Sequence, residues 1–190
     1  MIKQFISRIP PQVLLLLVAI IGYWQIALLH NSLKWDMIDV VLPWRYYVSE
    51  ALQNNYLPLW NPYQQMGYPI YADLQYPFWY LEQLIIGYTI GYNNYTLHFL
   101  FIFYIWLGGC GMYRLSSFLK VGKSAAFYAG IVYMLAGFMV GHVQSFTLIV
   151  GAAWVPHVVV QYMKLIKGNS FRHLPAAALF LFLLITGGYQ

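Results

Sequence analysis

Five long apolar runs alternate with shorter polar segments along the chain. They cover residues 13–29, 95–118, 125–143, 146–165 and 174–190. An α-helix rises about 1.5 Å per residue, so about 20 apolar residues cross the hydrocarbon core of a bilayer. The pattern therefore predicts an all-α protein, a polytopic membrane helix bundle, with residues 1–190 forming one transmembrane domain. No small-x-small cleavage site follows the first run, so we expect it to remain as a membrane anchor.

Basic residues are distributed unequally between the two sides that these runs define. Membrane proteins carry an excess of Lys and Arg in their cytoplasmic segments. With a cytoplasmic N-terminus, eight of the ten Lys and Arg residues fall on that side: Lys3, Arg8, Arg114, Lys120, Lys123, Lys164, Lys167 and Arg172. Lys34 and Arg45 fall on the other side. This distribution predicts that the N-terminus is cytoplasmic and that the polar loop 30–94 is extracytoplasmic.

The loop 30–94 contains shorter predicted elements. Residues 39–54 place apolar side chains at a mixed spacing of three and four, which predicts a helix along the membrane surface. Pro43 falls in its first turn, where a missing N–H costs little. Residues 57–71 are interrupted by three prolines and a glycine, which indicates an ordered, turn-rich segment. Residues 77–92 predict a second surface or re-entrant helix.

Composition narrows the functional classes. The chain is 61% hydrophobic and only 8% charged, and its net charge of +5 does not form the basic stripe typical of nucleic-acid binding. We therefore expect a lipid bilayer as partner and no nucleic acid. Nucleotide-binding glycine loops and zinc-protease histidine motifs are absent from the sequence. All five acidic residues lie in the loop 30–94: Asp36, Asp39, Glu50, Asp73 and Glu82.

Asp36 and Asp39 follow the first apolar run at positions i and i+3, and would share one face of a helical turn. Two carboxylates held close together can act as a general base on a hydroxyl group, or coordinate a hard divalent cation such as Mg²⁺ or Mn²⁺. In the structural alternative, Asp36 is a helix N-cap and Asp39 a first-turn residue facing the helix dipole.

Other polar residues are predicted at the same depth. Arg45 can bind a phosphate through two parallel hydrogen bonds, or it can anchor a lipid headgroup or pair with Asp39 or Glu50. His142 and Gln144 fall in the short connection between the third and fourth runs, and Gln190 ends the fifth run on the same side.

Several motifs resemble a known family. D-M-I-D-V-V-L-P-W-R-Y-Y at 36–47 and L-P-L-W-N-P-Y-Q-Q-M-G-Y-P-I-Y-A-D at 57–73 resemble the start of the bacterial YfhO-like membrane proteins. G-F-M-V-G-H-V-Q at 137–144 and A-A-W-V-P at 152–156 fit the same family. The closing T-G-G-Y-Q at 186–190 departs from a Gly-Gly-His-Pro-Gln-like ending.

The YfhO-like family is similar to the GT-C glycosyltransferases. The resemblance implies a bacterial inner (plasma) membrane enzyme that transfers a sugar from a polyprenyl-phosphate carrier to an extracytoplasmic, cell-envelope acceptor. It also implies an acidic base or metal ligand just after the first span, and Asp36 matches that position best, followed by Asp39 and Asp73. Family members are longer, so the chain is expected to be an N-terminal portion, and a site that needs later spans would be incomplete in it.

The candidate site residues fall into two groups. Asp36 and Asp39 are the catalytic and metal-binding candidates. The substrate-binding candidates are Trp44, Arg45, Trp60, Asn61, Tyr63, Tyr68, Asp73, His142, Gln144 and Gln190. A second hypothesis is a non-catalytic transporter or assembly subunit for lipid-linked or cell-envelope polymers. It predicts that neutralising the carboxylates abolishes no covalent product.

Overall fold

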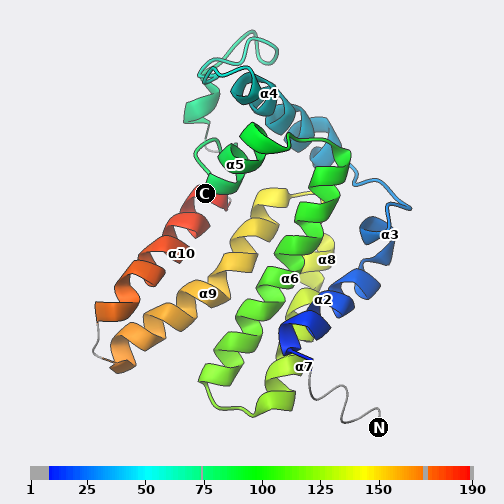
Figure 1. The fold of residues 1–190 in the computed structure, drawn as a ribbon. Coiled ribbons are helices and arrows are strands. Elements are labelled where there is room, and N and C mark those ends of the chain that lie inside the picture. The colour runs from blue at the N-terminus through cyan, green and yellow to red at the C-terminus, as the bar shows by residue number, and fades with distance from the viewer. Residues whose placement is uncertain (1–8, 74, 169–170, 189–190) are drawn as a thin grey trace.

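The computed structural model describes residues 9–73, 75–168 and 171–188. These residues form helices joined by turns and loops, and no β-strand occurs among them. The all-α prediction is therefore confirmed. Figure 1 shows a bundle of long helices with a smaller group of helices and loops lying across one end.

The bundle is built around α6 (Asn94–Phe118). It packs against α7 (Lys123–Met134) on one side and α9 (Phe146–Gly168) on the other, and α10 (Leu174–Gly187) packs on α9. α8 (Gly137–Gly141) follows α7 after a short break. Asn93 caps α6, since its side chain accepts a hydrogen bond from the Thr96 N–H, and the interior face of α6 is buried along most of its length.

Among the described residues, three helices are long and apolar enough to cross a membrane: Asn94–Phe118, Lys123–Gly141 and Phe146–Gly168. Shorter apolar helices occupy Pro11–Gly22 and Phe171–Gly187. The first predicted run, 13–29, is not one continuous helix. It divides at Tyr23 into α2 (Pro11–Gly22) and α3 (Trp24–Ala27). The Tyr23 hydroxyl donates to the Met134 carbonyl at 2.7 Å, which ties this break to the end of α7.

The helix predicted over 39–54 is present and extends further toward the N-terminus. A π-helical turn, η1 (Met37–Val41), leads without interruption into α4 (Leu42–Gln53), and Pro43 lies in the first turn of α4 as expected. Pro43 has no N–H to donate to the carbonyl four residues earlier. The chain instead forms the wider i→i+5 pattern, in which the Leu42 N–H donates to the Met37 carbonyl.

The rest of the polar segment is compact. α5 (Leu81–Thr89) packs against α4, and lies within the predicted helix 77–92. The turn-rich prediction for 57–71 is also confirmed: Asn61 and Tyr68 exchange backbone hydrogen bonds of 2.8 and 3.0 Å across a tight turn, and η2 (Ile70–Ala72) follows. Gly67 adopts a φ of +97° in that turn, where a Cβ would lie 2.7 Å from the Trp60 Nε1.

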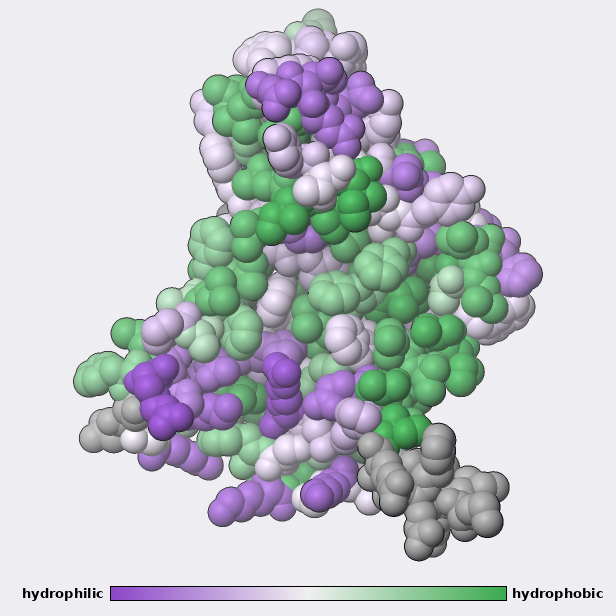
Figure 2. All heavy atoms as spheres, viewed as in Figure 1, coloured by the Kyte–Doolittle hydropathy of each residue, from purple (hydrophilic) through white to green (hydrophobic). Residues whose placement is uncertain are grey.

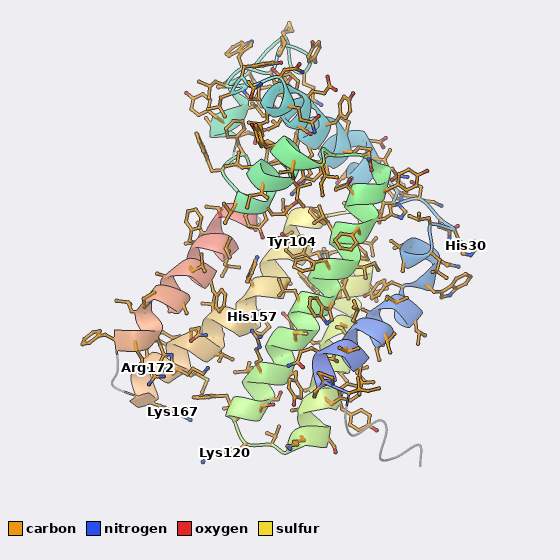
Figure 3. The ribbon with its side chains drawn as sticks, viewed as in Figure 1. His30, Tyr104, Lys120, His157, Lys167 and Arg172 are labelled. Atoms are coloured by element: carbon orange, nitrogen blue, oxygen red, sulfur yellow. The ribbon has the colours of Figure 1, made fainter. Side chains whose placement is uncertain are left out.

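The two ends of the bundle differ in chemistry. Lys120, Lys167 and Arg172 lie at one end, hereafter the basic end, opposite the end that carries α4 and α5 (Figure 3). Figure 2 shows that hydrophilic residues gather mostly toward the two ends of the visible face, with apolar residues between them. This arrangement is the one that the apolar runs predict.

Candidate functional site

A cavity of about 510 Å³ lies at the α4 end of the bundle. Three segments that are distant in sequence enclose it: the η1–α4 region, residues 75–77 and the start of α9. We call it the Arg45 cavity, and its described lining residues are Asp36, Val40, Val41, Trp44, Arg45, Gln75, Tyr76, Pro77, Gln144, Ser145, Phe146, Thr147 and Leu148.

Arg45 is almost completely buried, with 1% of its surface exposed, and its principal partner is Glu82 of α5. Its Nη1 donates to both Glu82 oxygens at 3.1 Å and to the Tyr92 hydroxyl oxygen at 2.9 Å. The Tyr92 hydroxyl in turn donates to Glu82 Oε1. The ion pair that the sequence suggested with Asp39 or Glu50 is therefore made with Glu82 instead, because α5 packs directly against α4.

The surroundings keep Arg45 charged. Burial by itself lowers the pKa of its guanidinium, but the charge of Glu82 and the neighbouring tyrosine oxygens outweigh it, so the pKa lies above its ordinary value. Aromatic rings add to this, since Cζ lies 5.0 Å from the ring centroid of Tyr92 and 4.7 Å from that of Phe146. Arg45 is therefore a fixed positive charge that links α4, α5 and the start of α9.

One edge of the Arg45 guanidinium is unpaired within the described part of the chain. Nε and Nη2 are buried and have no hydrogen-bond partner among the described residues. An unpaired buried donor costs about 1–3 kcal/mol. These two atoms form the fork that binds a carboxylate or phosphate through two parallel hydrogen bonds. Arg45 is one of the residues that line the cavity, and an anionic group that reaches this edge would satisfy both donors.

The start of α9 adds positive potential to the same cavity. Gln144 to Leu148 line it, and α9 continues for 23 residues from Phe146. The first N–H groups of a helix lack intrahelical acceptors and carry about half a positive charge between them. Together with the unpaired Arg45 donors, they make the cavity suitable for an anion.

Asp36 and Asp39 occupy different positions. Both are exposed, but only Asp36 lines the Arg45 cavity, where it is the one carboxylate among the described lining residues. The expectation that both share one face assumed α-helical geometry, whereas η1 is π-helical. Asp36 precedes η1 and makes no side-chain capping hydrogen bond, so the N-cap alternative is not observed.

The remaining candidates divide into those at the cavity and those outside it. Gln144 and Trp44 line it. His142 does not: its ring stacks on Phe138 at a centroid distance of 4.3 Å, and its Nδ1 lies 2.9 Å from the Phe138 carbonyl oxygen. Asp73 accepts a hydrogen bond from the Gln75 N–H at 2.8 Å, within a turn. Gln190 lies outside the described residues.

Residues from the turn-rich segment form a neighbouring cavity of about 390 Å³, which we call the aromatic cavity. Its described lining residues are Pro43, Trp44, Tyr46, Tyr47, Glu50, Tyr56, Asn61, Tyr63 and Gln64. Trp44 lines both cavities, whereas the predicted residues Trp60 and Tyr68 line neither. Trp60 instead packs on Gly67, and its carbonyl accepts a hydrogen bond from the Tyr47 hydroxyl at 2.7 Å.

Sequence reasoning gave no role to the residues that position Arg45. Glu82 was recognised only as one of five acids, although it is the one acidic residue of the predicted helix 77–92. Glu82 also begins a polar chain into the bundle. Tyr104 donates to its Oε2 at 3.5 Å, the Tyr80 and Tyr104 hydroxyls lie 2.7 Å apart, and Trp154 Nε1 donates to Tyr80 at 2.9 Å.

No group of three or more His, Cys, Asp or Glu side chains arranged to hold a metal ion occurs among the described residues. Asp36 by itself is one oxygen ligand, and Mg²⁺ sites often combine one or two carboxylates with substrate phosphates. A Mg²⁺ or Mn²⁺ ion at Asp36 and Asp39 therefore stays a prediction.

Comparison of the chain with protein-family models, with curated proteins and with solved structures finds no match. The resemblance to the YfhO-like proteins therefore rests on the sequence motifs alone.

Proposed function

We propose that this protein is a GT-C-like membrane glycosyltransferase that transfers a sugar from a polyprenyl-phosphate carrier to an extracytoplasmic acceptor in the cell envelope. One observation carries the proposal. Asp36 and Arg45 line the same cavity, and the Arg45 guanidinium keeps two buried donors that have no partner among the described residues, which supports a base and a site for a leaving phosphate close together.

The proposed location is the bacterial inner (plasma) membrane, with several spans and a cytoplasmic N-terminus. Three apolar helices of sufficient length in the described part of the chain support it. So does the position of Lys120, Lys167 and Arg172 at the end opposite the Arg45 cavity (Figure 3), since basic residues favour the cytoplasmic side. In this orientation the Arg45 cavity faces the extracytoplasmic side, where a carrier lipid presents its sugar.

In the proposed reaction, the carboxylate of Asp36 accepts the proton of an acceptor hydroxyl as its oxygen attacks the anomeric carbon. A bond forms between that oxygen and the anomeric carbon, and the bond from the anomeric carbon to the carrier phosphate oxygen breaks. The released polyprenyl phosphate keeps the bonding electrons. Arg45 Nε and Nη2, with the first amides of α9, stabilise the charge that develops on it.

A divalent metal could add to this charge stabilisation as a Lewis acid. Arg45 already supplies a buried, fixed positive charge, so the proposed steps depend on the residues of the chain. Chelation by EDTA distinguishes a metal-dependent reaction from a metal-independent one. Activity that survives chelation removes the metal from the proposal.

The decisive experiment uses the full-length protein in membranes with a panel of radiolabelled polyprenyl-phosphate sugars. Transfer in the wild type that is lost in Asp36→Asn, with the variant still folded and inserted, supports the enzyme and identifies its base. Absence of transfer from every donor favours the alternative, a non-catalytic subunit that handles lipid-linked polymers. Transfer that persists in Asp36→Asn removes Asp36 as the base.

A further inference from the structure

The aromatic cavity next to the Arg45 cavity is formed mainly by ring faces and hydroxyl groups. Tyr46, Tyr56 and Tyr63 expose about half or more of their surface, at 52%, 53% and 81%. Tyr63 also meets Tyr47 edge to face, at a centroid distance of 5.6 Å and an interplanar angle of 79°. Large aromatic side chains left exposed around one concave surface are typical of a binding site.

Residues with polar groups of both hydrogen-bonding types line the same cavity. Glu50 is exposed, and its Oε1 accepts a hydrogen bond from the Tyr46 hydroxyl at 3.1 Å. Gln64 Oε1 accepts from Trp44 Nε1 and, at 3.4 Å, from Asn61 Nδ2. This arrangement fixes the amide of Gln64 and leaves its Nε2 as a donor with no partner in the described part of the chain. The cavity thus offers a carboxylate acceptor and an amide donor beside aromatic faces.

We propose that the aromatic cavity binds a carbohydrate through its uncharged sugar rings. The C–H face of a pyranose packs on aromatic rings, and its hydroxyl groups both donate and accept hydrogen bonds, which matches the donor and acceptor found here. A quaternary ammonium ligand would use the rings and Glu50 but could not use the Gln64 donor. A phosphate-bearing polyol would bring negative charge close to Glu50, which disfavours it.

The position of the cavity gives this carbohydrate a role. Trp44 lines both cavities, so a sugar in the aromatic cavity lies beside the space that Asp36 and Arg45 share. A saccharide that extends past Trp44 would bring a hydroxyl group into the space that Asp36 lines, and we assign the acceptor role to it. The acceptor role rests on the proposed function, whereas the binding of a carbohydrate does not.

Binding can be measured directly by saturation-transfer difference NMR on the protein in lipid nanodiscs, which avoids glycoside detergents. The probes are glucose, N-acetylglucosamine and the β-1,4-linked tetrasaccharide of each, with choline and glycerol phosphate as competing ligand classes. Tyr63→Ala removes a ring face and Glu50→Gln removes the carboxylate. Tyr63→Phe keeps the ring, and Tyr88→Ala, an exposed tyrosine of α5 outside both cavities, is the matched control.

We expect saturable binding of at least one saccharide, weakened about tenfold by Tyr63→Ala and by Glu50→Gln. Tyr63→Phe and Tyr88→Ala should bind as the wild type does. Asp36→Asn should also keep saccharide binding while it loses sugar transfer. Binding therefore tests this inference, and transfer tests the proposed function separately. Saturable binding of choline or glycerol phosphate alone, or of no probe at all, would overturn the proposal.

Discussion

The guanidinium of Arg45 and the carboxylate of Glu82 meet at 3.1 Å across the interface between α4 and α5, with only one nitrogen of the guanidinium engaged in the pair. Glu82 holds Arg45 through Nη1 and leaves Nε and Nη2 buried and without a partner among the described residues. The ion pair therefore has two separable effects, one on the stability of the helix packing and one on anion binding.

Glu82→Gln should strongly destabilise the protein. It removes the charge that compensates a buried guanidinium, and breaking such a pair from one side costs about 3–5 kcal/mol. Thermal unfolding in nanodiscs measures the change. Replacing Arg45 and Glu82 together with methionine should restore most of the stability, yet still abolish anion binding. A double variant as unstable as the single one would show that the pair contributes more than charge compensation.

Arg45→Lys should retain much of the stability but bind anions poorly. Lysine keeps the positive charge near Glu82 but lacks the planar fork of donors. Binding of farnesyl phosphate, a short polyprenyl monophosphate, should weaken about tenfold or more, because hydrogen bonds to charged groups contribute about 1.5–3 kcal/mol. Lys34→Ala is the control, since Lys34 does not line the cavity. Equal affinity in wild type and Arg45→Lys would contradict the assignment of Nε and Nη2.

Asp36→Asn and Asp39→Asn should differ in sugar transfer. Asp36 lines the Arg45 cavity and Asp39 does not, so only the first substitution should lower the rate, by about 10²–10⁴-fold for loss of a general base. Initial rates with a saturating donor distinguish them. Loss of activity in Asp39→Asn alone would move the base to the other carboxylate.

Gly67→Ala should distort the 61–68 turn. Its φ of +97° disfavours any side chain, and a Cβ would also collide with the Trp60 indole. Gly122→Ala is a matched control, because Gly122 has a φ of +89° but no heavy atom of the described residues lies within 4 Å of the position that its Cβ would take. We expect both substitutions to destabilise the protein by about 1 kcal/mol or more and Gly67→Ala to cost more. Equal melting temperatures would show that the Trp60 contact is not rigid.

Stability should fall in alkaline solution. Burial raises the pKa values of Tyr76 and Tyr92 above the ordinary value of 10.0. The positive charge of Arg45 opposes this effect, and the negative charge of Glu82 adds to it. When the folded-state pKa of a tyrosine is raised, the neutral hydroxyl stabilises the folded protein. This contribution to the free energy of unfolding is complete below pH 10 and is lost as the pH rises above 10. Melting temperatures from about pH 8 to 11 measure this, and Tyr92→Phe should flatten the decline.

Local sequence patterns predicted the helices and turns well, because their causes lie within a few residues. The apolar spacing in 39–54 and the position of Pro43 sufficed for α4, and the prolines and Gly67 sufficed for the turn at 57–71. The break at Tyr23 could not be predicted this way. Its hydroxyl is held by the Met134 carbonyl, 111 residues away in sequence.

The candidate site could be predicted only in part, because some of its contacts join residues that are far apart in the sequence. Asp36, Arg45, Trp44 and Gln144 were identified by residue type and predicted depth, and the structure brings them to one cavity. The pairing of Arg45 with Glu82 spans 37 residues and depends on the packing of α5 on α4, which no local pattern encodes. The different positions of Asp36 and Asp39 relative to the cavity could not be predicted either, because they depend on the π-helical turn.

The π-helical turn η1 makes the geometry of the site depend on the number of residues between Asp36 and Arg45. Each residue of an α-helix advances the chain by about 100°, so the length of the segment 37–41 fixes the angular phase of Asp36 relative to Arg45. Substitutions within the segment preserve this phase, whereas deletion of one residue would rotate the carboxylate away from the cavity. The relation between acid and cation is thus set by a count of residues, and insertions or deletions there would be far more harmful than changes of side chain.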